Sequence, residues 1–415
     1  MIKKAFSKRV LIICPYPKGK APSQRFRFEQ YLDLFELDYE QHSFWSEREW
    51  LRLYEGGSTM YKVKSTMIAF TRRVRLLFKV SKFDKVFIHR EATPVGPPWF
   101  EWVVAKVFRK PIIYDFDDAI WLPNSSKANE KLIGKFKNHG KTAKNCSWAK
   151  TVVVGNEFLA EYAREFCEDV RVIPTTVDTE GYHNPELYRE DSSEYRVGST
   201  ETGKKGYKEQ GSRYKDLDKV SREQKSNNSV SASSLKPEAS GLPTIGWTGT
   251  HSTLKQLVPL FPTLEEVFKK LPFRFLLIAD QAPEEMPDFV EFIKWKKETE
   301  IEDLMEIDIG VMPLFDSEWE RGKCGFKAIQ YSALGIPSVV SAVGVNSDVV
   351  QTGITGYVVN EMYSDNRVYT HWDESLTELV KSRNLRIKMG KAGRSRMIEK
   401  YSKEKNEKKY FQLFF

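Results

Sequence analysis

The segment Arg321–Pro337, RGKCGFKAIQYSALGIP, holds three cations in a glycine-containing stretch where a loop leads into a helix. It follows a predicted strand that ends in VMPL and precedes another, SVVS, so the loop would lie at the carboxyl edge of a parallel sheet. Backbone N–H groups and the helix dipole at such a place favour a phosphate group. Arg321, Lys323 and Lys327 would surround that anion, and a packed loop with solvated lysines is the alternative. The pattern predicts a binding site for a phosphorylated ligand.

A second loop with the residues of a phosphate site is Ile245–Thr253, IGWTGTHST, at the first strand of the second half of the chain. Gly249 would let the backbone approach a ligand closely, and Thr250 and Ser252 supply hydroxyls. A tight turn with a helix N-cap explains the same residues without a ligand. The Arg321–Pro337 segment strengthens the prediction that this loop binds phosphate, because both would lie at the edge of one sheet.

The segment Tyr114–Trp121, YDFDDAIW, places three carboxylates at the end of a short apolar strand. Asp115 and Asp117 have Asp-x-Asp spacing, which would suit a divalent metal that bridges to a phosphate. The predicted phosphate loops argue against a metal here, because they come much later in the chain, in a separate series of strands. We therefore do not interpret Asp115 and Asp117 as a metal site.

Short apolar runs alternate with helical stretches along both halves of the chain, as in a parallel sheet covered on both faces. In the first half the predicted strands are 9–14, 85–89, 111–114, 151–154 and 170–173. In the second half they are 244–247, 273–278, 307–312, 338–340 and 356–359. Two successive strand–helix series predict an α/β chain with two doubly wound, Rossmann-like domains.

The predicted boundaries divide the chain into a first domain, an insertion, a second domain and a closing helix, at residues 1–186, 187–241, 242–400 and 401–415. The insertion is rich in Ser, Lys, Glu, Gly and Asn, and has too little apolar surface to offset the entropy of ordering. It is predicted to be a disordered or loosely attached linker, and a regulatory or partner-binding segment is the alternative. The closing segment ends in YFQLFF, which is too apolar to remain in water, so we expect it to dock on the rest of the protein.

Composition narrows the class of protein. The net charge is +8 and the pI is about 9.0, which suits nucleic acid, an anionic membrane face or phosphorylated substrates. No nucleic-acid-binding motif is visible, so no nucleic-acid partner is predicted. There is no long apolar run or signal peptide, and the four cysteines have neither metal-ligand nor disulfide spacing. A cytoplasmic protein is expected, with peripheral contact to the inner face of the membrane left open.

One helical stretch bears on that contact. Residues 61–83 carry Met67, Phe70, Val74, Leu77 and Phe78 at helical spacing, among several lysines and arginines. Such a helix would lie on anionic lipid. An amphipathic helix more often packs its apolar side chains on its own sheet, and both interpretations stay open.

The Arg321–Pro337 segment resembles the donor-binding motif of the family 4 glycosyltransferases, a Glu-x7-Glu pattern followed by small residues, Gly and Pro. Aligned on the final Gly and Pro, the second glutamate falls on Gln330 and the first on Gly322. The amide of Gln330 would still bond ribose hydroxyls, and Glu320 lies close enough in sequence to substitute for the first glutamate. The Ile245–Thr253 loop is similar to the family as well, and the resemblance covers nearly the whole chain except the insertion.

The resemblance implies a GT-B fold, in which two Rossmann-like domains face a cleft and the second domain binds the donor. It implies transfer of a sugar from a nucleoside diphosphate sugar to a hydroxyl of a glycan or lipid-linked acceptor, a precursor of cell-surface polysaccharide. Retention at the anomeric carbon, with the leaving phosphate assisting the hydroxyl, is implied as well. The donor is a co-substrate, and no cofactor is predicted. A non-catalytic sugar-nucleotide-binding protein is the alternative, because both motif glutamates are missing.

The predicted site residues fall into three groups. Those expected to act in catalysis are Asp117, Asp118 and Glu320. Those expected to bind the donor are Gly249, Thr250, Ser252, Arg321, Lys323, Lys327 and Gln330. Those expected to bind the acceptor, from loops that would face the same cleft, are Arg25, Arg27 and His89.

Overall fold

The computed structural model describes most of the chain, namely residues 8–54, 59–123, 140–188, 241–360, 362–364, 367–369 and 371–415. Residues 1–188 and 243–415 form one compact unit. The insertion expected at 187–241 lies outside the described residues except at its two ends. Its character, and the four boundaries given above, therefore stay predictions.

The first half contains a six-stranded, all-parallel sheet in the order β2-β1-β3-β4-β5-β6. Its strands are β1 (Val10–Cys14), β2 (Tyr39–Ser43), β3 (Lys85–His89), β4 (Ile112–Phe116), β5 (Thr151–Val154) and β6 (Val170–Val172). Its helices are α1 (Pro22–Gln24), η1 (Arg25–Glu29), α2 (Gln30–Leu32), α3 (Glu47–Tyr54), α4 (Thr59–Leu77), η2 (Val80–Lys82), α5 (Trp99–Trp102), η3 (Val103–Val107), α7 (Lys141–Trp148), α8 (Glu157–Arg164) and η5 (Pro185–Leu187).

The second half contains another six-stranded parallel sheet, in the order β12-β11-β10-β7-β8-β9. Its strands are β7 (Thr244–Gly249), β8 (Arg274–Ala279), β9 (Val290–Lys294), β10 (Ile309–Met312), β11 (Ser338–Ser341) and β12 (Gly356–Val359), with the separate hairpin β13 (Met362–Ser364) and β14 (Arg367–Tyr369). Its helices are η6 (His251–Thr253), α9 (Leu254–Leu257), η7 (Val258–Leu260), α10 (Phe261–Lys270), α11 (Glu300–Met305), α12 (Glu318–Arg321), α13 (Phe326–Ala333), α14 (Asn346–Val349), α15 (Trp372–Lys381), α16 (Arg383–Arg396), η8 (Met397–Tyr401) and α17 (Lys403–Phe414).

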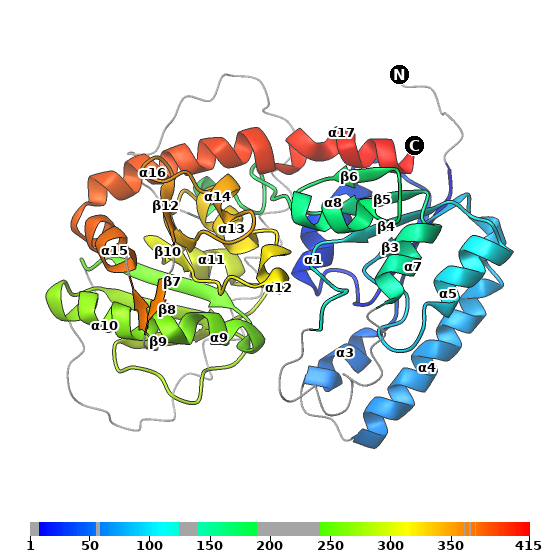
Figure 1. Cartoon of the computed structure of the whole chain (residues 1–415), viewed down its shortest axis with the longest axis horizontal. Coiled ribbons are helices and arrows are strands. Elements are labelled where there is room, and N and C mark those ends of the chain that lie inside the picture. The colour runs from blue at the N-terminus through cyan, green and yellow to red at the C-terminus, as the bar shows by residue number, and fades with distance from the viewer. Residues whose placement is uncertain are drawn as a thin grey trace, which may run out of the picture. The chain divides into compact units, whose positions relative to one another are not determined.

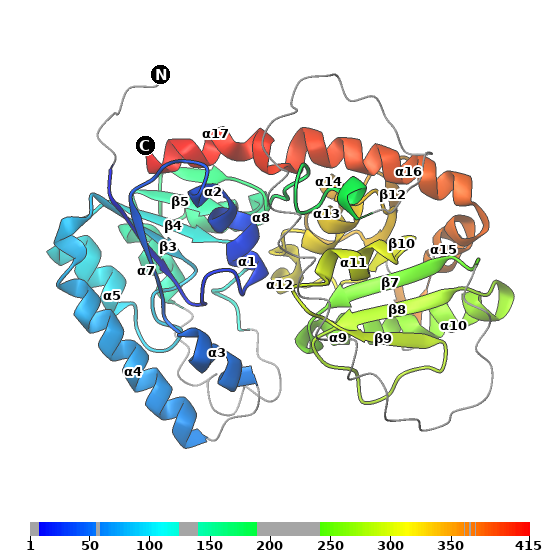
Figure 2. The same cartoon turned by 180° about the vertical axis from the view of Figure 1, so that it is seen from behind.

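Both sheets are buried on two faces, which is why their central strands are continuous apolar runs. In β8, Phe275 and Leu277 pack with α9, α10 and α15, whereas Leu276 and Ile278 pack with α11 and α13. Figure 1 and Figure 2 show these helices on opposite sides of the sheet. In the first half, even and odd positions of β1 divide in the same way between two core clusters. Two doubly wound domains are thus confirmed.

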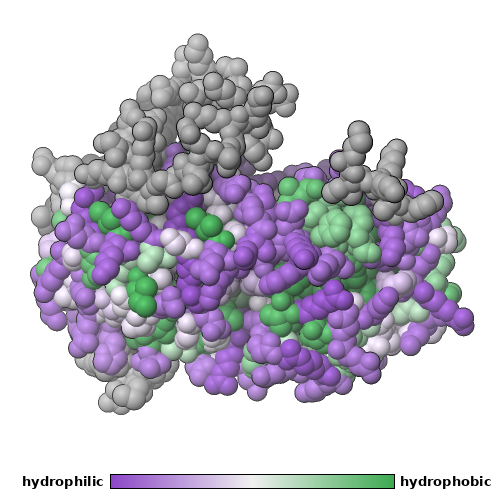
Figure 3. Space-filling view, turned by 90° about the horizontal axis from the view of Figure 1, so that it is seen from above, coloured by the Kyte–Doolittle hydropathy of each residue, from purple (hydrophilic) through white to green (hydrophobic). Residues whose placement is uncertain are grey.

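The final helix, α17, packs on the first sheet although it follows the second half in sequence. Tyr410, Leu413 and Phe414 are buried in the same core as β1, and the Tyr410 ring stacks on Tyr31 at 4.1 Å. Lys85 donates a hydrogen bond to the Leu413 carbonyl. The face on which α16 and α17 lie is mostly hydrophilic (Figure 3). Among the described helices, none is long and apolar enough to cross a bilayer.

Among the strands of the two six-stranded sheets, the sequence missed β2 and β9, and both lie at an edge of their sheet. It also missed the hairpin β13–β14. The sequences of β2 and β9, YEQHS and VEFIK, are half-exposed and carry no apolar run. An edge strand pairs on one side only and does not need two buried faces, so a search for continuous apolar runs overlooks it.

Candidate functional site

Asp115, in β4, is the centre of a buried ion cluster at the carboxyl edge of the first sheet. It accepts hydrogen bonds from Arg27 Nη2 at 2.5 Å and from His89 Nδ1 at 2.6 Å, and all three side chains are fully buried. Burial by itself raises the pKa of Asp115, but Arg27 and His89 outweigh it and lower that pKa to about 2. Arg27 and His89 were expected to bind an acceptor. Their geometry favours a structural role, because neither side chain reaches the surface.

Asp117 and Asp118 follow β4 and share one arginine. Arg90 Nε donates to Asp117 Oδ1 at 2.8 Å, and Arg90 Nη2 donates to Asp118 Oδ2 at 2.5 Å. Burial raises the pKa of Asp118, Arg90 opposes that rise, and Asp117 adds to it. Asp117 is buried and Asp118 is partly exposed. Two carboxylates are thus held by a cation of the protein at the position where the sequence offered a metal site.

The cationic loop of the second half lies between β10 and α13, as predicted. Gly325 precedes α13 with a φ of 65°, a conformation that favours glycine, and no side chain caps this helix start. Lys323 and Lys327 flank the helix start, and within the described residues neither forms an ion pair. Burial and the neighbouring Lys323 lower the pKa of Lys327 to about 7. Arg321 lies apart from them, exposed and bonded to Asp316 at 2.6 Å.

The carboxyl-terminal part of strand β7 contacts α13, and the second predicted loop follows that strand. The ammonium of Lys327 lies 5.3 Å from the centre of the Trp247 ring, and Thr248 N donates to the Tyr331 hydroxyl at 3.0 Å. Gly249 is the last residue of β7. The hydroxyls of Thr250 and Ser252 are exposed and lie 2.9 Å apart.

The cationic loop also contacts the first half of the chain. Asn156 Nδ2 donates to the carbonyls of Gly322 and Lys323, at 3.0 Å each, and Cys324 Sγ donates to the Asp117 carbonyl at 3.1 Å. These contacts bring Lys323 close enough to Asp118 to oppose, as Arg90 does, the rise in the pKa of that carboxyl that burial causes. The predicted acidic loop and the predicted cationic loop are therefore assembled into one site.

Gly322 occupies a place with no room for a side chain. A Cβ there would lie 2.8 Å from the Ala119 Cβ and 2.9 Å from the Ala119 backbone nitrogen. Glu320, its expected substitute, is buried and accepts hydrogen bonds from Gln256 at 2.7 Å and from Ser317. The side chain of Glu320 is thus used inside its own domain, where it supports α12, and this geometry does not favour contact with a sugar.

Gln330 and Arg25 also have protein partners. Gln330 is buried in α13, with its amide nitrogen 3.4 Å from Nε2 of His183. Burial is the main cause that lowers the pKa of His183 to about 3, so the ring is neutral. Arg25 pairs with Glu300 at 3.1 Å and lies over the Tyr182 ring. The contacts predicted for Gln330 with ribose and for Arg25 with an acceptor stay predictions.

The sequence interpretation passed over Arg90 and Asn156 as site residues. Arg90 directly follows His89 in the sequence, and its backbone φ of 58° is a tertiary feature. Asn156 caps α8 through a hydrogen bond from Leu159 N, while its amide holds the cationic loop. An Asn two residues after the strand TVVV is a detectable N-cap signal, but the second partner of Asn156 lies 166 residues away.

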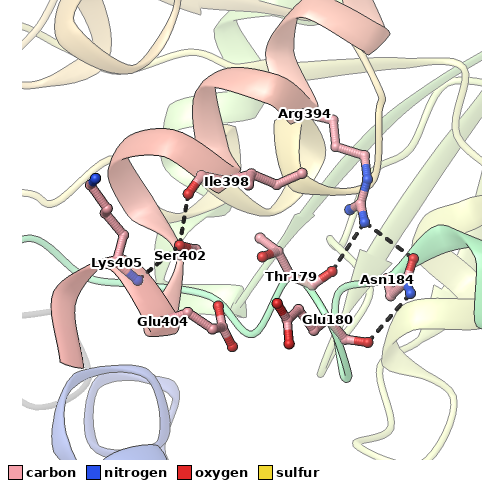
Figure 4. A pocket seen from close by; sticks show the side chains of 8 residues that line it. All are labelled: Thr179, Glu180, Asn184, Arg394, Ile398, Ser402, Glu404 and Lys405. Atoms are coloured by element: carbon pink, nitrogen blue, oxygen red, sulfur yellow. Dashed lines mark hydrogen bonds between the residues drawn. The ribbon is translucent and has the colours of Figure 1, made fainter. Parts of the chain in front are cut away.

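A hollow of about 500 Å³ lies elsewhere, between the segment after β6 and the helices α16, η8 and α17 (Figure 4). Arg394 spans it and donates to the Thr179 carbonyl and to Asn184 Oδ1, at 3.0 and 3.1 Å. Its lining includes none of the predicted site residues. We interpret it as part of the structural junction that connects α16 to the first half.

Residues 242–367 match the family model described as glycosyl transferases group 1. No curated protein matches the chain. Among solved structures, a glycosyltransferase from Rickettsia africae ESF-5 is 14% identical with a TM-score of 0.58, and the match covers 99% of this chain and 98% of that one. The sucrose-phosphate synthase from Thermosynechococcus elongatus is 13% identical with a TM-score of 0.63, and 98% of each chain is covered.

A third similar structure is Anabaena HepE in complex with UDP and glucose, which is 10% identical with a TM-score of 0.57 over 98% of this chain and 99% of that one. At these identities the likeness concerns the fold, and it extends over both sheets. The family model covers the β7 loop and the α13 loop, the two places where the sequence resembles the family. Residues 242–367 are thus similar to the glycosyl transferases group 1, and the whole chain has the GT-B fold.

Proposed function

We propose that this protein transfers a sugar from a nucleoside diphosphate sugar to a hydroxyl of a glycan or lipid-linked acceptor, with retention. The observation that carries the proposal is the placement of Lys323 and Lys327 at the uncapped start of α13, against the Trp247 ring and beside Asp118. Two ammonium groups with no ion pair among the described residues favour a dianionic ligand. A diphosphate provides that charge.

In the proposed reaction the bond between the anomeric carbon and the diphosphate oxygen breaks, and its electron pair stays on the phosphate. Lys323, Lys327 and the backbone N–H groups that begin α13 stabilise the developing charge. The acceptor hydroxyl attacks from the same face, and its proton passes to the departing phosphate. Asp118, which faces Lys323, would orient that hydroxyl. Arg90 would hold both Asp117 and Asp118 in position.

The proposed reaction needs no metal and no cofactor. The donor set at the acidic loop fits a metal poorly, because Asp115 is saturated by Arg27 and His89 and the other two carboxylates are bonded to Arg90. Within the part of the chain that the structure describes, no group of three acidic, His or Cys side chains could hold an ion. We further propose a cytoplasmic protein that works at the inner face of the membrane on a precursor of cell-surface polysaccharide.

The second candidate is a sugar-nucleotide-binding protein without turnover. Two observations favour it: position 322 has no space for the motif glutamate, and Gln330 faces His183. A sugar contact of the family pattern would then be missing at Gly322 and changed at Gln330, whereas Lys323 and Lys327 would still bind phosphate.

A screen of nucleoside diphosphate sugars by thermal shift tests both candidates, because a bound donor raises the melting temperature. The stabilising donor is then incubated with the protein, and release of the nucleoside diphosphate is followed by chromatography. Release above the rate without protein supports the transferase. Stabilisation without any release supports the binding protein, and no stabilisation by any donor contradicts both.

A further inference from the structure

Helix α4 exposes a stripe of large apolar side chains to solvent. The stripe consists of Met60, Val63, Met67 and Val74 in α4 and Phe78 directly after it, spaced by three, four, seven and four residues. All five are exposed, with 82% exposure at Met60, 66% at Met67 and 81% at Phe78. Ile68, also exposed, lies beside them. We call these five residues the α4 stripe.

The opposite face of α4 makes the contact with the rest of the first half, and it is mostly small or polar. Its buried residues are Ser65, Ala69, Arg73 and Leu76. Arg73 donates hydrogen bonds to the carbonyls of Cys14, His42 and Ala92, at 2.8–3.1 Å. A surface helix normally turns its apolar side chains inward. In α4 hydrogen bonds, small side chains and Leu76 hold the helix, and the five residues of the α4 stripe remain without a described partner.

The sequence left open whether this helix lies on lipid or packs its apolar side chains on its own sheet. Packing on the sheet is wrong for Met67, Val74 and Phe78, since all three are exposed. Phe70 and Leu77 are partly buried, and Phe70 contacts Phe44. In Figure 1 and Figure 2, α4 lies along the border of the molecule with α5 beside it.

The charges on the helix itself have one sign. Residues 59–82 contain seven lysines and arginines and no Asp or Glu, and two of these cations pair with carboxylates of other elements, Arg72 with Glu49 and Lys79 with Glu40. Two of the cations, Lys64 and Arg75, are exposed and flank the stripe directly. A second copy of this helix would present the same cations, which repel. An anionic lipid surface offers the opposite charge and an apolar layer beneath it.

We infer that α4 docks flat in the interface of an anionic bilayer, with the α4 stripe among the acyl chains and the flanking cations at the headgroups. The helix is about 28 Å long at 1.5 Å per residue, so all five side chains reach the membrane together. Arg73 links the docked helix to the carboxyl ends of β1 and β3, where Arg90 and the acidic loop begin. Docking thus orients that edge of the sheet toward a lipid-linked acceptor. The inference goes beyond the proposed function, and binding to lipid does not depend on turnover.

The test is sedimentation of the full chain with vesicles of phosphatidylcholine alone, or of equal parts phosphatidylcholine and phosphatidylglycerol. We expect binding to the anionic vesicles only, with partial release at high salt, because salt screens the headgroup charge. The double variant M67S/F78S should lower partitioning by about tenfold or more. The variant K64E/R75E should lower it by about fivefold or more for each cation.

Two matched controls distinguish vesicle binding through the α4 stripe from nonspecific binding. Leu187→Ser removes an apolar side chain that is 64% exposed, and Lys388→Glu reverses an exposed cation, both outside α4. Both should bind like the original chain, and all variants should keep its melting temperature. Absence of binding by the original chain overturns the inference, as does undiminished binding by M67S/F78S or equal loss in the controls. Self-association in light scattering that M67S/F78S abolishes, without vesicle binding, would assign the stripe to a second copy.

Discussion

The ammonium of Lys327 lies 5.3 Å from the centre of the Trp247 ring, which joins the start of α13 to the end of β7. The ring is 1% exposed, so its position is set by the core, and it holds the ammonium at the helix start. Attraction between a cation and the face of an indole offsets part of the cost of burying the charge. Lys323, close by, increases that cost and makes an anionic ligand favourable.

We expect Lys327→Ala to weaken binding of a nucleoside diphosphate far more than binding of the nucleoside. A charge-assisted contact is worth roughly 1.5–3 kcal/mol, and the nucleoside carries no phosphate to lose it. Calorimetry with both ligands measures the difference, and Lys388→Ala serves as the control for removal of an exposed lysine. Equal losses for the two ligands would show that Lys327 does not contact the diphosphate.

Binding of the diphosphate should take up protons between about pH 7 and pH 9. Burial and Lys323 lower the pKa of Lys327 to about 7, so much of the amine is neutral there, and an anion favours the charged form. Calorimetry in buffers of different ionisation enthalpy counts these protons. The free protein should also gain stability from this group as pH rises above about 7, since the unfolded amine still binds a proton that the folded one has lost. Lys327→Met should abolish both effects, and unchanged proton uptake would point to another group.

The variant Asp115→Asn should destabilise the first half strongly. It leaves Arg27 buried without its carboxylate, and breaking a buried ion pair in this way costs roughly 3–5 kcal/mol. Because the pKa of Asp115 is lowered to about 2, its contribution is present above about pH 4 and is lost as pH falls toward 2. Denaturant unfolding at neutral and acid pH checks both points. Asp316→Asn, in the exposed pair with Arg321, is the matched control, and we expect it to have no measurable effect.

Replacing Gly322 by Ala should weaken the contact between the cationic loop and the first half. The new Cβ would lie 2.9 Å from the backbone nitrogen of Ala119, and backbone cannot yield as a side chain does. We expect a loss of roughly 1–3 kcal/mol in stability and weaker donor binding. Gly393→Ala is the control, because a Cβ there meets Ser332 at an ordinary 3.5 Å. Donor affinity and stability equal to those of the unchanged chain would mean that this contact is dispensable.

Activity should survive EDTA, since protein cations take the place of a bridging metal in the proposed site. Asp117→Ala should harm use of the acceptor and spare donor affinity, because this carboxylate pairs with Arg90 and lies on the acceptor side. Initial rates at varied donor and acceptor concentrations separate the two effects. If Asp117 only holds the loop, stability and both affinities should fall together. Loss of donor binding in EDTA that manganese restores would contradict the metal-free mechanism.

The sequence by itself determined the two parallel sheets, the two phosphate-type loops and the acidic loop. These features depend on local patterns, since central strands need continuous apolar runs and each loop follows its strand directly. The edge strands β2 and β9 were not predicted, because an edge strand need not be apolar on both faces.

Only the tertiary structure decided which polar residues remain free to act. Asp115 lies 88 residues from Arg27 and 26 from His89, and no local pattern indicates that the three are buried together. No local pattern explains the glycine at position 322 either. A side chain there would collide with Ala119, which comes from the other half of the chain. The outward direction of the α4 stripe also depended on the fold. Helical spacing defines a stripe, but the partners of the opposite face, above all Arg73 and its three carbonyls, decide which side turns inward.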